Sequence, residues 1–358
     1  MTGLLAQGTF IMAQDHDRRE YRVSRRHALG RMFWAGTACT ILPVAPTRLR
    51  LFERAEAALT AQARPTIVVI AKNSTSPYWR TVLSGACRAG QDFDVKVIDL
   101  AAQSDTDLSA QLEIAVTSNP TAVVIAPAGF EQLRTPLDEA AKKIRIIGLD
   151  SAVDSRAFTS ILKGDGIQAG RIAADIVAER IQKTYADAEG DVALLIPSAK
   201  TVAIDQRASG FREQLTAKYG ALNIVTEKEV DPASSHDVMA EIIAGFPELR
   251  GVFVADLTVV LGAAQAIAEN KTNKTGDKIN LVGFDWDEKL VDLLDRGTIA
   301  ALVVRDPFRL GYESVKAALA ASKGEQVPAL IDIAAGLVTK ANMNSSRSQE
   351  LLHPKMEC

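Results

Sequence analysis

The sequence predicts an α/β protein made of two lobes, each built on a doubly wound parallel sheet. Short apolar runs rich in β-branched residues recur from residue 66 onward, and segments with helical periodicity separate them. This alternation is typical of parallel sheets that helices cover on both faces. About nine strand–helix units follow one another, which is more than one open sheet usually holds, so we expect two lobes.

The composition is that of an ordinary soluble protein, with 358 residues of which 47% are hydrophobic and 24% charged. No run of about 18 apolar residues appears after residue 60, which excludes a multispan membrane protein. Three cysteines are too few for a disulfide framework, and we expect Cys87 to be a small buried apolar residue. The four histidines are scattered without metal-ligand spacing, so no metal and no cofactor is expected.

Residues 1–63 differ in charge from the rest of the chain. They hold nine arginines and five acidic residues, a net charge of +4, which leaves −7 for residues 64–358 because the whole chain carries −3. The segment SRRHAL at 24–29 precedes a short, weakly apolar run and is similar to a twin-arginine export signal. A disordered basic tail is the alternative. We expect residues 1–63 to be an export signal and leader that direct the protein to the periplasm.

Nine segments have the composition of strands buried on both faces of a parallel sheet. They are 66–71, 95–100, 122–126, 144–150, 192–196, 223–230, 251–255, 279–285 and 299–304. Between them, residues 108–118 and 167–181 carry apolar side chains at helical spacing. The glycine-punctuated segment 160–166 is expected to be a crossover between the lobes.

Polar and aromatic side chains follow the carboxyl ends of these strands, where open α/β sheets bind ligands. The set comprises Tyr78, Trp79, Asp150, Ser151, Arg207, Asp256, Asp285, Trp286 and Arg305. Each residue alone has a simpler explanation, since an aspartate after a strand often caps the next helix and an arginine is often a solvated surface charge. Their recurrence around two lobes favours a binding site.

The chemistry of this set suits a small polyhydroxylated ligand. Carboxylates accept hydrogen bonds from hydroxyl groups, guanidinium groups donate them, and both kinds of bond are assisted by charge. The rings of Tyr78, Trp79 and Trp286 can stack on the C–H faces of a sugar. Three acids and two arginines nearly balance, which fits a neutral sugar or sugar alcohol. A sugar acid paired with Arg207 or Arg305 is the alternative.

Other function classes find little support. No G-x-S-x-G, P-loop, H-E-x-x-H or Cys–His arrangement occurs, so no catalytic residue is assigned and an enzyme is disfavoured. Paired carboxylates for glycoside hydrolysis stay open as a possibility. A DNA-binding regulator needs an N-terminal helix-turn-helix and a basic surface, whereas residues 64–358 are acidic, so no nucleic-acid partner is expected.

An ordered set of motifs between residues 65 and 342 resembles the ribose-type periplasmic substrate-binding proteins of ABC transporters. These proteins have the type 1 periplasmic binding protein fold, which the cores of LacI-type repressors share. Five segments are similar to blocks of this family in order and spacing. They are TIVVIAKNSTSPYWRTVLSGA, IIGLDS, GDGIQAGRIAADIV, QRASGF and the block that begins INLVGFDWDEKL. The resemblance implies two lobes that close over one ligand and that three crossovers join. We expect crossovers near 164–166, 304–306 and 329–332.

The resemblance also implies boundaries for the parts of the chain. The expected parts are a first lobe of 64–165 plus 306–330, a second lobe of 166–305 plus 331–343, and a tail of 344–358.

In the first lobe the resemblance places five ligand positions. Ser76 stands where the family has a polar residue before proline, usually Asn, and Tyr78 and Trp79 match its two stacking aromatics. Asp150 matches the aspartate of an Asp–Arg pair, but the arginine position holds Ser151.

In the second lobe, Arg207 and Asp285 match an arginine and an aspartate of the family. Asp256 stands where Asn or Asp is usual, and Arg305 where Gln is common. A further aromatic expected near 232–236 is absent. These departures leave the particular sugar open.

The resemblance implies partners as well. The loaded protein is expected to dock, as a monomer, on an ABC transporter permease, and to meet the membrane only through the transporter or an uncleaved leader. A receptor that reports ligand occupancy to a chemoreceptor or a sensor kinase is the alternative.

Overall fold

The structure is a computed structural model of the chain. It describes residues 64–72, 76–102, 105–127, 130–150, 155–271 and 279–354. The chain divides into two units, 1–62 and 63–358, and every described residue belongs to the second unit. The expected export signal therefore lies outside the described residues. Within the described ranges, no helix combines the length and the apolar character needed to cross a membrane.

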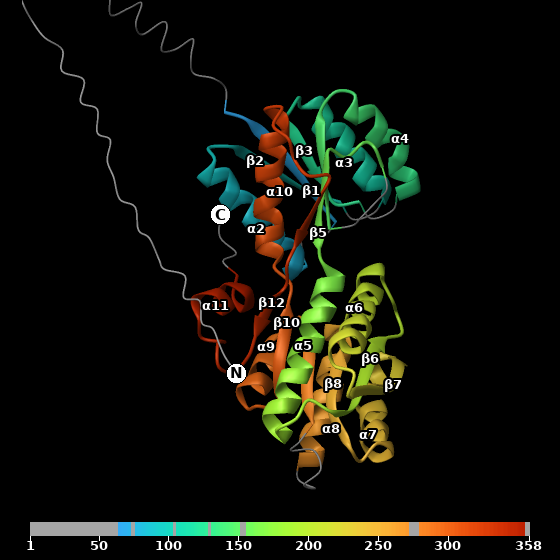
Figure 1. Cartoon of the computed structure of the whole chain (residues 1–358). Coiled ribbons are helices and arrows are strands. Elements are labelled where there is room, and N and C mark those ends of the chain that lie inside the picture. Colours follow the sequence, from blue (N-terminus) through green and yellow to red (C-terminus); the bar gives the residue numbers. More distant parts are fainter. Residues whose placement is uncertain are drawn as a thin grey trace, which may run out of the picture. The chain divides into compact units, whose positions relative to one another are not determined.

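The first lobe is built on a six-stranded parallel sheet with the order β11-β5-β4-β3-β1-β2. Its strands are β1 (Thr66–Ala71), β2 (Lys96–Ala101), β3 (Ala122–Ile125), β4 (Arg145–Leu149), β5 (Ser160–Gly164) and β11 (Leu330–Ile333). Two helices cover each face of this sheet (Figure 1). They are α2 (Pro77–Asp92) with α10 (Pro307–Ser322), and α3 (Asp105–Thr117) with α4 (Phe130–Ala141).

The second lobe is built on another six-stranded sheet, with the order β12-β10-β9-β8-β6-β7. Its strands are β6 (Gly190–Pro197), β7 (Leu222–Val230), β8 (Leu249–Val254), β9 (Asn280–Phe284), β10 (Ile299–Val304) and β12 (Gly336–Val338). Helices again pack on both faces. They are α5 (Gly166–Tyr185), α6 (Val202–Lys218), α7 (Ser235–Gly245), α8 (Leu257–Lys271) and α9 (Glu288–Asp295), with a 3₁₀ turn η1 (Pro232–Ser234) and, after β12, α11 (Ser346–Leu352).

Strand for strand, the two sheets have the same order. In this order β4 of the first sheet corresponds to β9 of the second, and β5 corresponds to β10. The prediction of two doubly wound lobes is confirmed, with one difference in detail, because β12 pairs antiparallel with β10. The shared order means that each strand of the first sheet has an equivalent strand end in the second.

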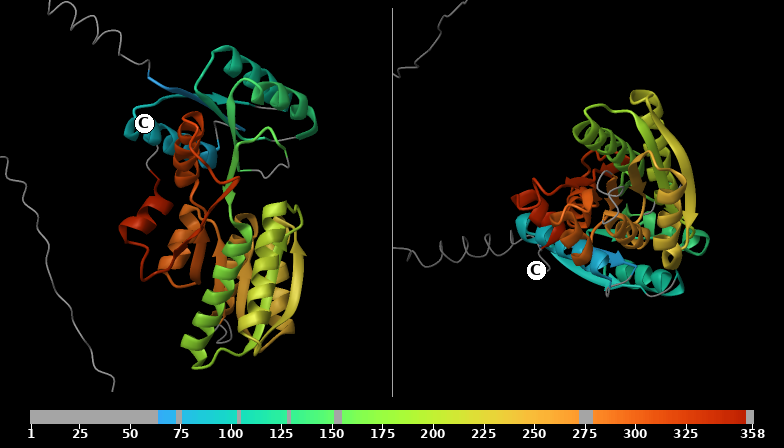
Figure 2. Two further views of the ribbon diagram at one scale, coloured as in Figure 1. Left: turned by 45° about the horizontal axis from the view of Figure 1, so that its top comes forward. Right: turned by 90° about the horizontal axis from the view of Figure 1, so that it is seen from below.

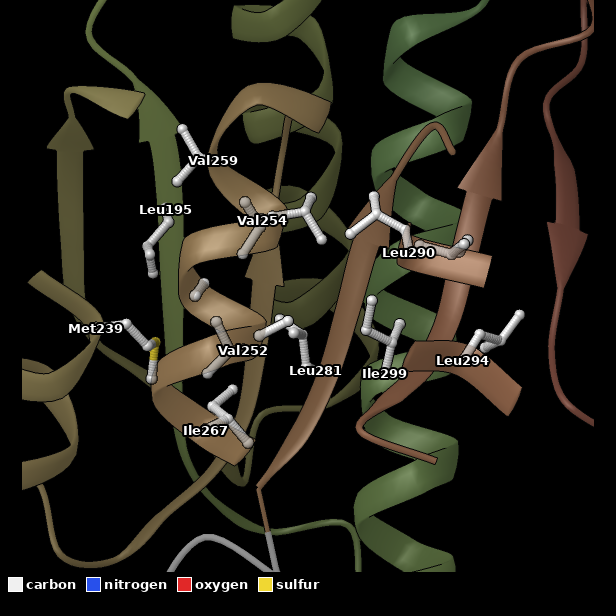
Figure 3. Close-up of a cluster of buried hydrophobic side chains, with 14 of the residues drawn as sticks. Leu195, Met239, Val252, Val254, Val259, Ile267, Leu281, Leu290, Leu294 and Ile299 are labelled. Atoms are coloured by element: carbon white, nitrogen blue, oxygen red, sulfur yellow. The ribbon is translucent and has the colours of Figure 1, made fainter. Parts of the chain in front are cut away.

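The apolar runs form strands because both faces of each sheet are covered. Residues 67–71 of β1 are each no more than 1% exposed. Figure 3 shows the equivalent packing in the second lobe, where side chains of β6, β8 and β9 meet those of α7, α8 and α9. Leu195, Val254 and Leu281 lie in this cluster, and all three are fully buried. Alternation of covered strands and amphipathic helices is the pattern from which the fold was predicted.

Three segments carry the chain between the sheets. β5 leads through Asp165 into α5, β10 leads through 305–306 into α10, and β11 leads through 334–335 into β12. Figure 2 shows these segments, coloured green, orange and red, passing between the lobes. The third segment lies a few residues beyond the expected 329–332, because β11 extends the first sheet as far as Ile333.

Cys87 differs from the expectation drawn from the sequence. It lies on α2, it is only partly buried, and it is disulfide-bonded. The two other cysteines of the chain, Cys39 and Cys358, lie outside the described residues. Three cysteines are too few for a framework of disulfides, but one bond needs only two of them.

Candidate functional site

Two aspartates occupy equivalent strand ends in the two sheets. Asp150 follows β4 and Asp285 follows β9, and both have left-handed backbones, with φ of 67° and 61°. The amide of Asp150 donates to the carbonyl of Leu162 at 2.7 Å, and that of Asp285 to the carbonyl of Val303 at 2.8 Å. Aspartate tolerates this conformation better than most residues, and such backbones gather at functional sites. The same turn therefore fixes one carboxylate at the carboxyl edge of each sheet.

The carboxylate of Asp150 collects donors from the start of the first lobe. The Tyr78 hydroxyl donates to Asp150 Oδ1 at 2.8 Å, and Lys72 Nζ lies 3.4 Å from Oδ2. Burial, and then the charge of Asp150, raise the pKa of Tyr78 well above its usual value. Tyr78 is therefore a neutral hydrogen-bond donor throughout the physiological pH range.

Trp79 lies deeper than Tyr78. It is 7% exposed and packs in the apolar cluster between α2, α10 and the first sheet. Its ring meets that of Tyr78 edge to face, with centroids 5.2 Å apart, and Lys72 Nζ lies 5.7 Å from its centroid. The indole thus packs against the ring of Tyr78 and helps to hold it in place.

Asp285 is bonded to Arg305, which follows the neighbouring strand β10. Arg305 Nε donates to Asp285 Oδ2 at 2.8 Å, Nη2 lies 2.5 Å from the same oxygen, and the backbone amide donates to Oδ1 at 3.2 Å. Partial burial disfavours the charge of Arg305, but the Asp285 carboxylate outweighs it and raises the pKa of the guanidinium. The carbon of that guanidinium lies 4.5 Å from the centre of the Tyr78 ring. The contacts therefore run from Asp150 through Tyr78 and Arg305 to Asp285.

Arg207 reaches the same edge of the second sheet from α6. It is 4% exposed, and its Nη1 donates to the carbonyl of Ala255 at 2.7 Å and to Asp256 Oδ2 at 3.4 Å. Its guanidinium carbon lies 3.6 Å from the centre of the Phe284 ring. Burial lowers the pKa of Arg207 to about 10, so the group is charged at neutral pH. Within the described part of the chain its Nε is buried and has no hydrogen-bond partner.

Asp256 has the helix-capping role that the sequence offered as the simpler explanation, and it also pairs with Arg207. Its Oδ1 accepts from the amide and the hydroxyl of Thr258 at 3.1 and 2.9 Å, which is the capping role. Its Oδ2 faces Arg207. One carboxylate therefore starts α8 and also balances the buried guanidinium.

A pair of glycines brings Arg207 into place. A Cβ on Gly170 of α5 would lie 2.0 Å from the carbonyl oxygen of Arg207, and one on Gly210 of α6 would lie 2.1 Å from that of Ile167. No side chain fits in either position, so α5 and α6 approach backbone to backbone at these two points. The close approach fixes the helix that carries Arg207.

Of the three remaining candidates, Ser76 and Trp286 stand apart from these contacts, and Ser151 is not described. Ser76 precedes α2, and its carbonyl accepts from the amide of Arg80 at 3.0 Å, but its side chain makes no capping bond. Ser151 lies outside the described residues. Trp286 packs against the cluster beneath α7 to α9, and its ring lies 5.9 Å from that of His353.

Two residues of the site were missed by the sequence analysis. Lys72 pairs with Asp150, and its place directly after the first strand was a signal that could have found it. Phe284 supports Arg207 from the strand residue before Asp285, where its apolar character indicates only core packing. Among the described residues, no group of three or more His, Cys, Asp or Glu side chains is arranged to hold a metal ion.

Residues 67–326 match the periplasmic binding protein domain. This chain belongs to the periplasmic binding protein family. The match covers most of the part of the chain that follows the basic segment 1–63, and it includes all the site residues described above.

Known proteins resemble this periplasmic binding protein along most of its length. A carbohydrate transporter solute-binding protein from Agrobacterium radiobacter, solved in complex with D-arabinose, is 44% identical, with a TM-score of 0.64 over 82% of this chain and 100% of that one. The ribose import binding protein RbsB of Haemophilus influenzae is 25% identical, over 76% of this chain and 91% of its own. The D-allose-binding periplasmic protein of Escherichia coli is 25% identical, over 75% and 88%. The expected fold and family are confirmed.

Proposed function

We propose that this protein captures a small neutral sugar or sugar alcohol between its lobes in the periplasm and delivers it to an ABC transporter permease. The observation that carries the proposal is the pairing of charges at the strand ends. Asp285 is paired with Arg305, Asp256 with Arg207, and Asp150 with Lys72. A site whose charges are already balanced offers donors and acceptors to hydroxyl groups without demanding a charged ligand.

The same pairing argues against the sugar acid considered above. A ligand carboxylate would have to displace Asp285 from Arg305 or Asp256 from Arg207, and the displaced carboxylate would be left near a second negative charge. The names of the relatives point in the same direction, since they bind ribose, D-allose and D-arabinose. We infer a pentose or hexose in the neutral form as the ligand class.

The arrangement of the site residues supports capture by closure. Tyr78 and Asp150 belong to the first lobe, and Arg207, Asp256 and Asp285 to the second, so a ligand bonded to both groups links the lobes. A ligand that contacts both lobes stabilises the arrangement in which they lie close together. We propose that the permease distinguishes this loaded form from the empty one.

The test is a ligand screen on the unit that begins at Ala63. Of the three tryptophans in the chain only Trp79 and Trp286 remain in this unit, and both adjoin site residues, so their fluorescence should report binding. The screen titrates pentoses, hexoses, polyols and sugar acids, and thermal shift provides a second readout. A ligand at 100 times its Kd stabilises a fold by about 2.7 kcal/mol, a clear shift in Tm. We expect a neutral sugar to give both signals, and binding of sugar acids alone would overturn the proposal.

A further inference from the structure

The segment after β12 has no part in the binding site proposed above. Helix α11 and the residues behind it, 345–354, lie beyond residue 326, where the family match ends. We call these residues the C-terminal clamp. Figure 1 shows α11 in red beside β12.

Apolar side chains attach the clamp to the second lobe. Leu351 and Leu352 are 4% and 0% exposed and belong to the apolar cluster beneath α7, α8 and α9. A Cβ on Gly336 of β12 would lie 2.3 Å from Leu351 Cδ1, so the leucine packs directly on the backbone of that strand. Gln349 Nε2 donates to the carbonyl of Met343 at 2.8 Å. The clamp is therefore a fixed part of the second lobe.

Among the described residues, an ion pair joins the clamp to Asp306, in the second connecting segment at the start of α10. Arg347 Nη2 lies 2.5 Å from Asp306 Oδ2, and the side chain of Asp306 is only 4% exposed. Asp306 also starts α10, since its Oδ1 accepts from the amide of Arg309 at 2.9 Å. Helix α10 packs against α2 in the first lobe. The ion pair thus attaches the clamp to the second of the three segments that connect the lobes.

A cavity lies between the clamp and the first lobe, and the end of the chain beyond it holds Cys358, one of the two candidate partners of the disulfide-bonded Cys87 on α2, so the variants below are compared in the presence of reductant. The cavity has a volume of about 720 Å³. Its lining includes Arg88 of α2, Phe308 and Tyr312 of α10, and Arg347 and Glu350 of α11. Glu350 also lies near Arg347, at 3.5 Å, and belongs to the clamp itself.

The clamp contacts two residues that each directly follow a site residue in the sequence. Asp306, the partner of Arg347, directly follows Arg305, and Trp286, the partner of the His353 ring at 5.9 Å, directly follows Asp285. Asp285 and Arg305 are bonded to each other, and Arg305 lies over Tyr78 of the first lobe. The clamp therefore packs next to the ends of β9 and β10, which carry Asp285 and Arg305 of the proposed binding site.

We propose that Arg347 is a positioning residue that holds the second connecting segment in the arrangement in which Arg305 meets Tyr78. It favours the arrangement of lobes that binds ligand, without touching the ligand itself. The affinity of a ligand falls by the fraction of protein in the competent arrangement, so loss of the ion pair weakens binding and speeds ligand release. This inference rests on the proposed function, because it concerns the affinity for the same ligand.

Two variants break the ion pair from its two ends. Arg347→Ala removes the cation and leaves the buried Asp306 carboxylate unpaired. Asp306→Asn removes the charge but keeps an oxygen for the amide of Arg309, since asparagine caps helices as well as aspartate does. Arg347→Lys keeps the charge and should restore part of the effect. Arg296→Ala is the matched control, because Arg296 is an exposed arginine of the second lobe paired with Asp292 four residues earlier.

Two measurements follow on each variant. Stopped-flow tryptophan fluorescence gives the release rate of a sugar that the unchanged protein binds, with D-arabinose and D-ribose as the probes. Small-angle scattering of the ligand-free protein gives the spread of lobe arrangements. We expect Arg347→Ala and Asp306→Asn each to raise the release rate by about tenfold and to increase the ligand-free radius of gyration. The double variant should add little to either single one.

The outcomes separate the two proposals. Unchanged release rates and unchanged scattering in both variants would overturn the role of Arg347, as would a lowered Tm with neither of these changes. If the unchanged protein binds none of the sugars, the proposed function fails. The radius of gyration of the ligand-free variants then still tests whether Arg347 holds the arrangement of the lobes. Equal effects from Arg296→Ala would show a general response to lost surface charge and would also overturn the inference.

Discussion

At the scale of single residues, one side chain serves two needs at several positions of the site. Asp256 caps α8 with one oxygen and balances Arg207 with the other. Asp285 adopts a left-handed backbone and binds Arg305 through both of its oxygens. From sequence alone, a helix cap and a binding carboxylate could not be separated at these positions, because the same oxygen chemistry serves both roles.

Asp285 provides the sharpest test of the site. Asp285→Asn keeps the size and the tolerance of a left-handed backbone, but it removes the charge that Arg305 requires. We expect sugar affinity to fall by a factor of about ten to a hundred, since a charge-assisted hydrogen bond contributes roughly 1.5–3 kcal/mol. Isothermal titration calorimetry measures the change. Asp138→Asn, an exposed aspartate on α4, is the control. Unchanged affinity in Asp285→Asn would remove this residue from the site.

Tyr78 gives a prediction about pH. Its pKa is raised in the folded state, by burial and by the charge of Asp150. Above pH 10 the unfolded chain releases this proton while the folded protein retains it, so the free energy of unfolding falls as the pH rises. Tyr78→Phe should remove part of that fall, which urea denaturation at pH 9 and pH 10.5 measures. An identical pH dependence in the two proteins would contradict the assigned burial of the hydroxyl.

At the scale of elements, the sequence predicted the strands that helices cover and missed the short strands at the sheet edge that carries the connecting segments. All nine predicted runs correspond to strands. The strands inside each sheet are buried on both faces, which demands continuous apolar residues, whereas β2 and β7 at the sheet edges are only partly buried. β5, β11 and β12 were not predicted as strands. They have three to five residues each, and SILKG and LIDI mix polar with apolar residues, so none of them forms a long continuous apolar run. Each of them forms by pairing with a strand elsewhere in the chain. In one case Leu330 of β11 pairs with Ile161 of β5, which lies about 170 residues earlier.

The contact between α5 and α6 gives a prediction for an element. Gly210→Ala places a methyl group about 2.1 Å from the carbonyl oxygen of Ile167, so the helices must separate. We expect the free energy of unfolding to fall by about 1–3 kcal/mol, together with a loss of sugar affinity because Arg207 shifts. Urea denaturation and ligand titration measure the two effects. Gly245→Ala, where nothing lies within 4 Å of the added carbon, is the control and should change neither. Equal behaviour of the two variants would refute the role of close approach.

The disulfide of Cys87 gives another prediction for an element. Cys87 has two candidate partners, Cys39 in the basic leader and Cys358. Arg88, next to Cys87, and Pro354, four residues before Cys358, line the same cavity. Four residues reach about 13 Å, so we predict a bond to Cys358. Peptide mapping of the exported protein without reductant should find the two cysteines in one linked peptide. A free Cys87 thiol, or a link to Cys39, would contradict this assignment.

At the scale of the whole molecule, the site is a product of the repeated sheet order. Asp150 and Asp285 hold equivalent positions after β4 and β9, so each lobe supplies one strand-end carboxylate, and Tyr78 and Arg305 connect them. The ends of parallel strands are predictable from sequence, and most of the candidate site residues that the structure brings into contact were selected in this way. The place of Trp286 was not predictable, because its packing against His353 depends on a segment 67 residues further along the chain.

The basic segment 1–63, which we expect to be an export signal, holds two pairs of arginines. Arg25 and Arg26 stand in the SRRHAL segment that is similar to a twin-arginine signal, whereas Arg18 and Arg19 lie seven residues earlier without that context. Changing Arg25 and Arg26 to lysine keeps the charge of the leader but removes the guanidinium groups. We therefore expect this variant to accumulate in the cytoplasm, while the same change at Arg18 and Arg19 leaves export intact. Cell fractionation followed by immunoblotting measures both. Periplasmic recovery of the first variant at the level of the unchanged protein would show that export depends on charge alone or on another route.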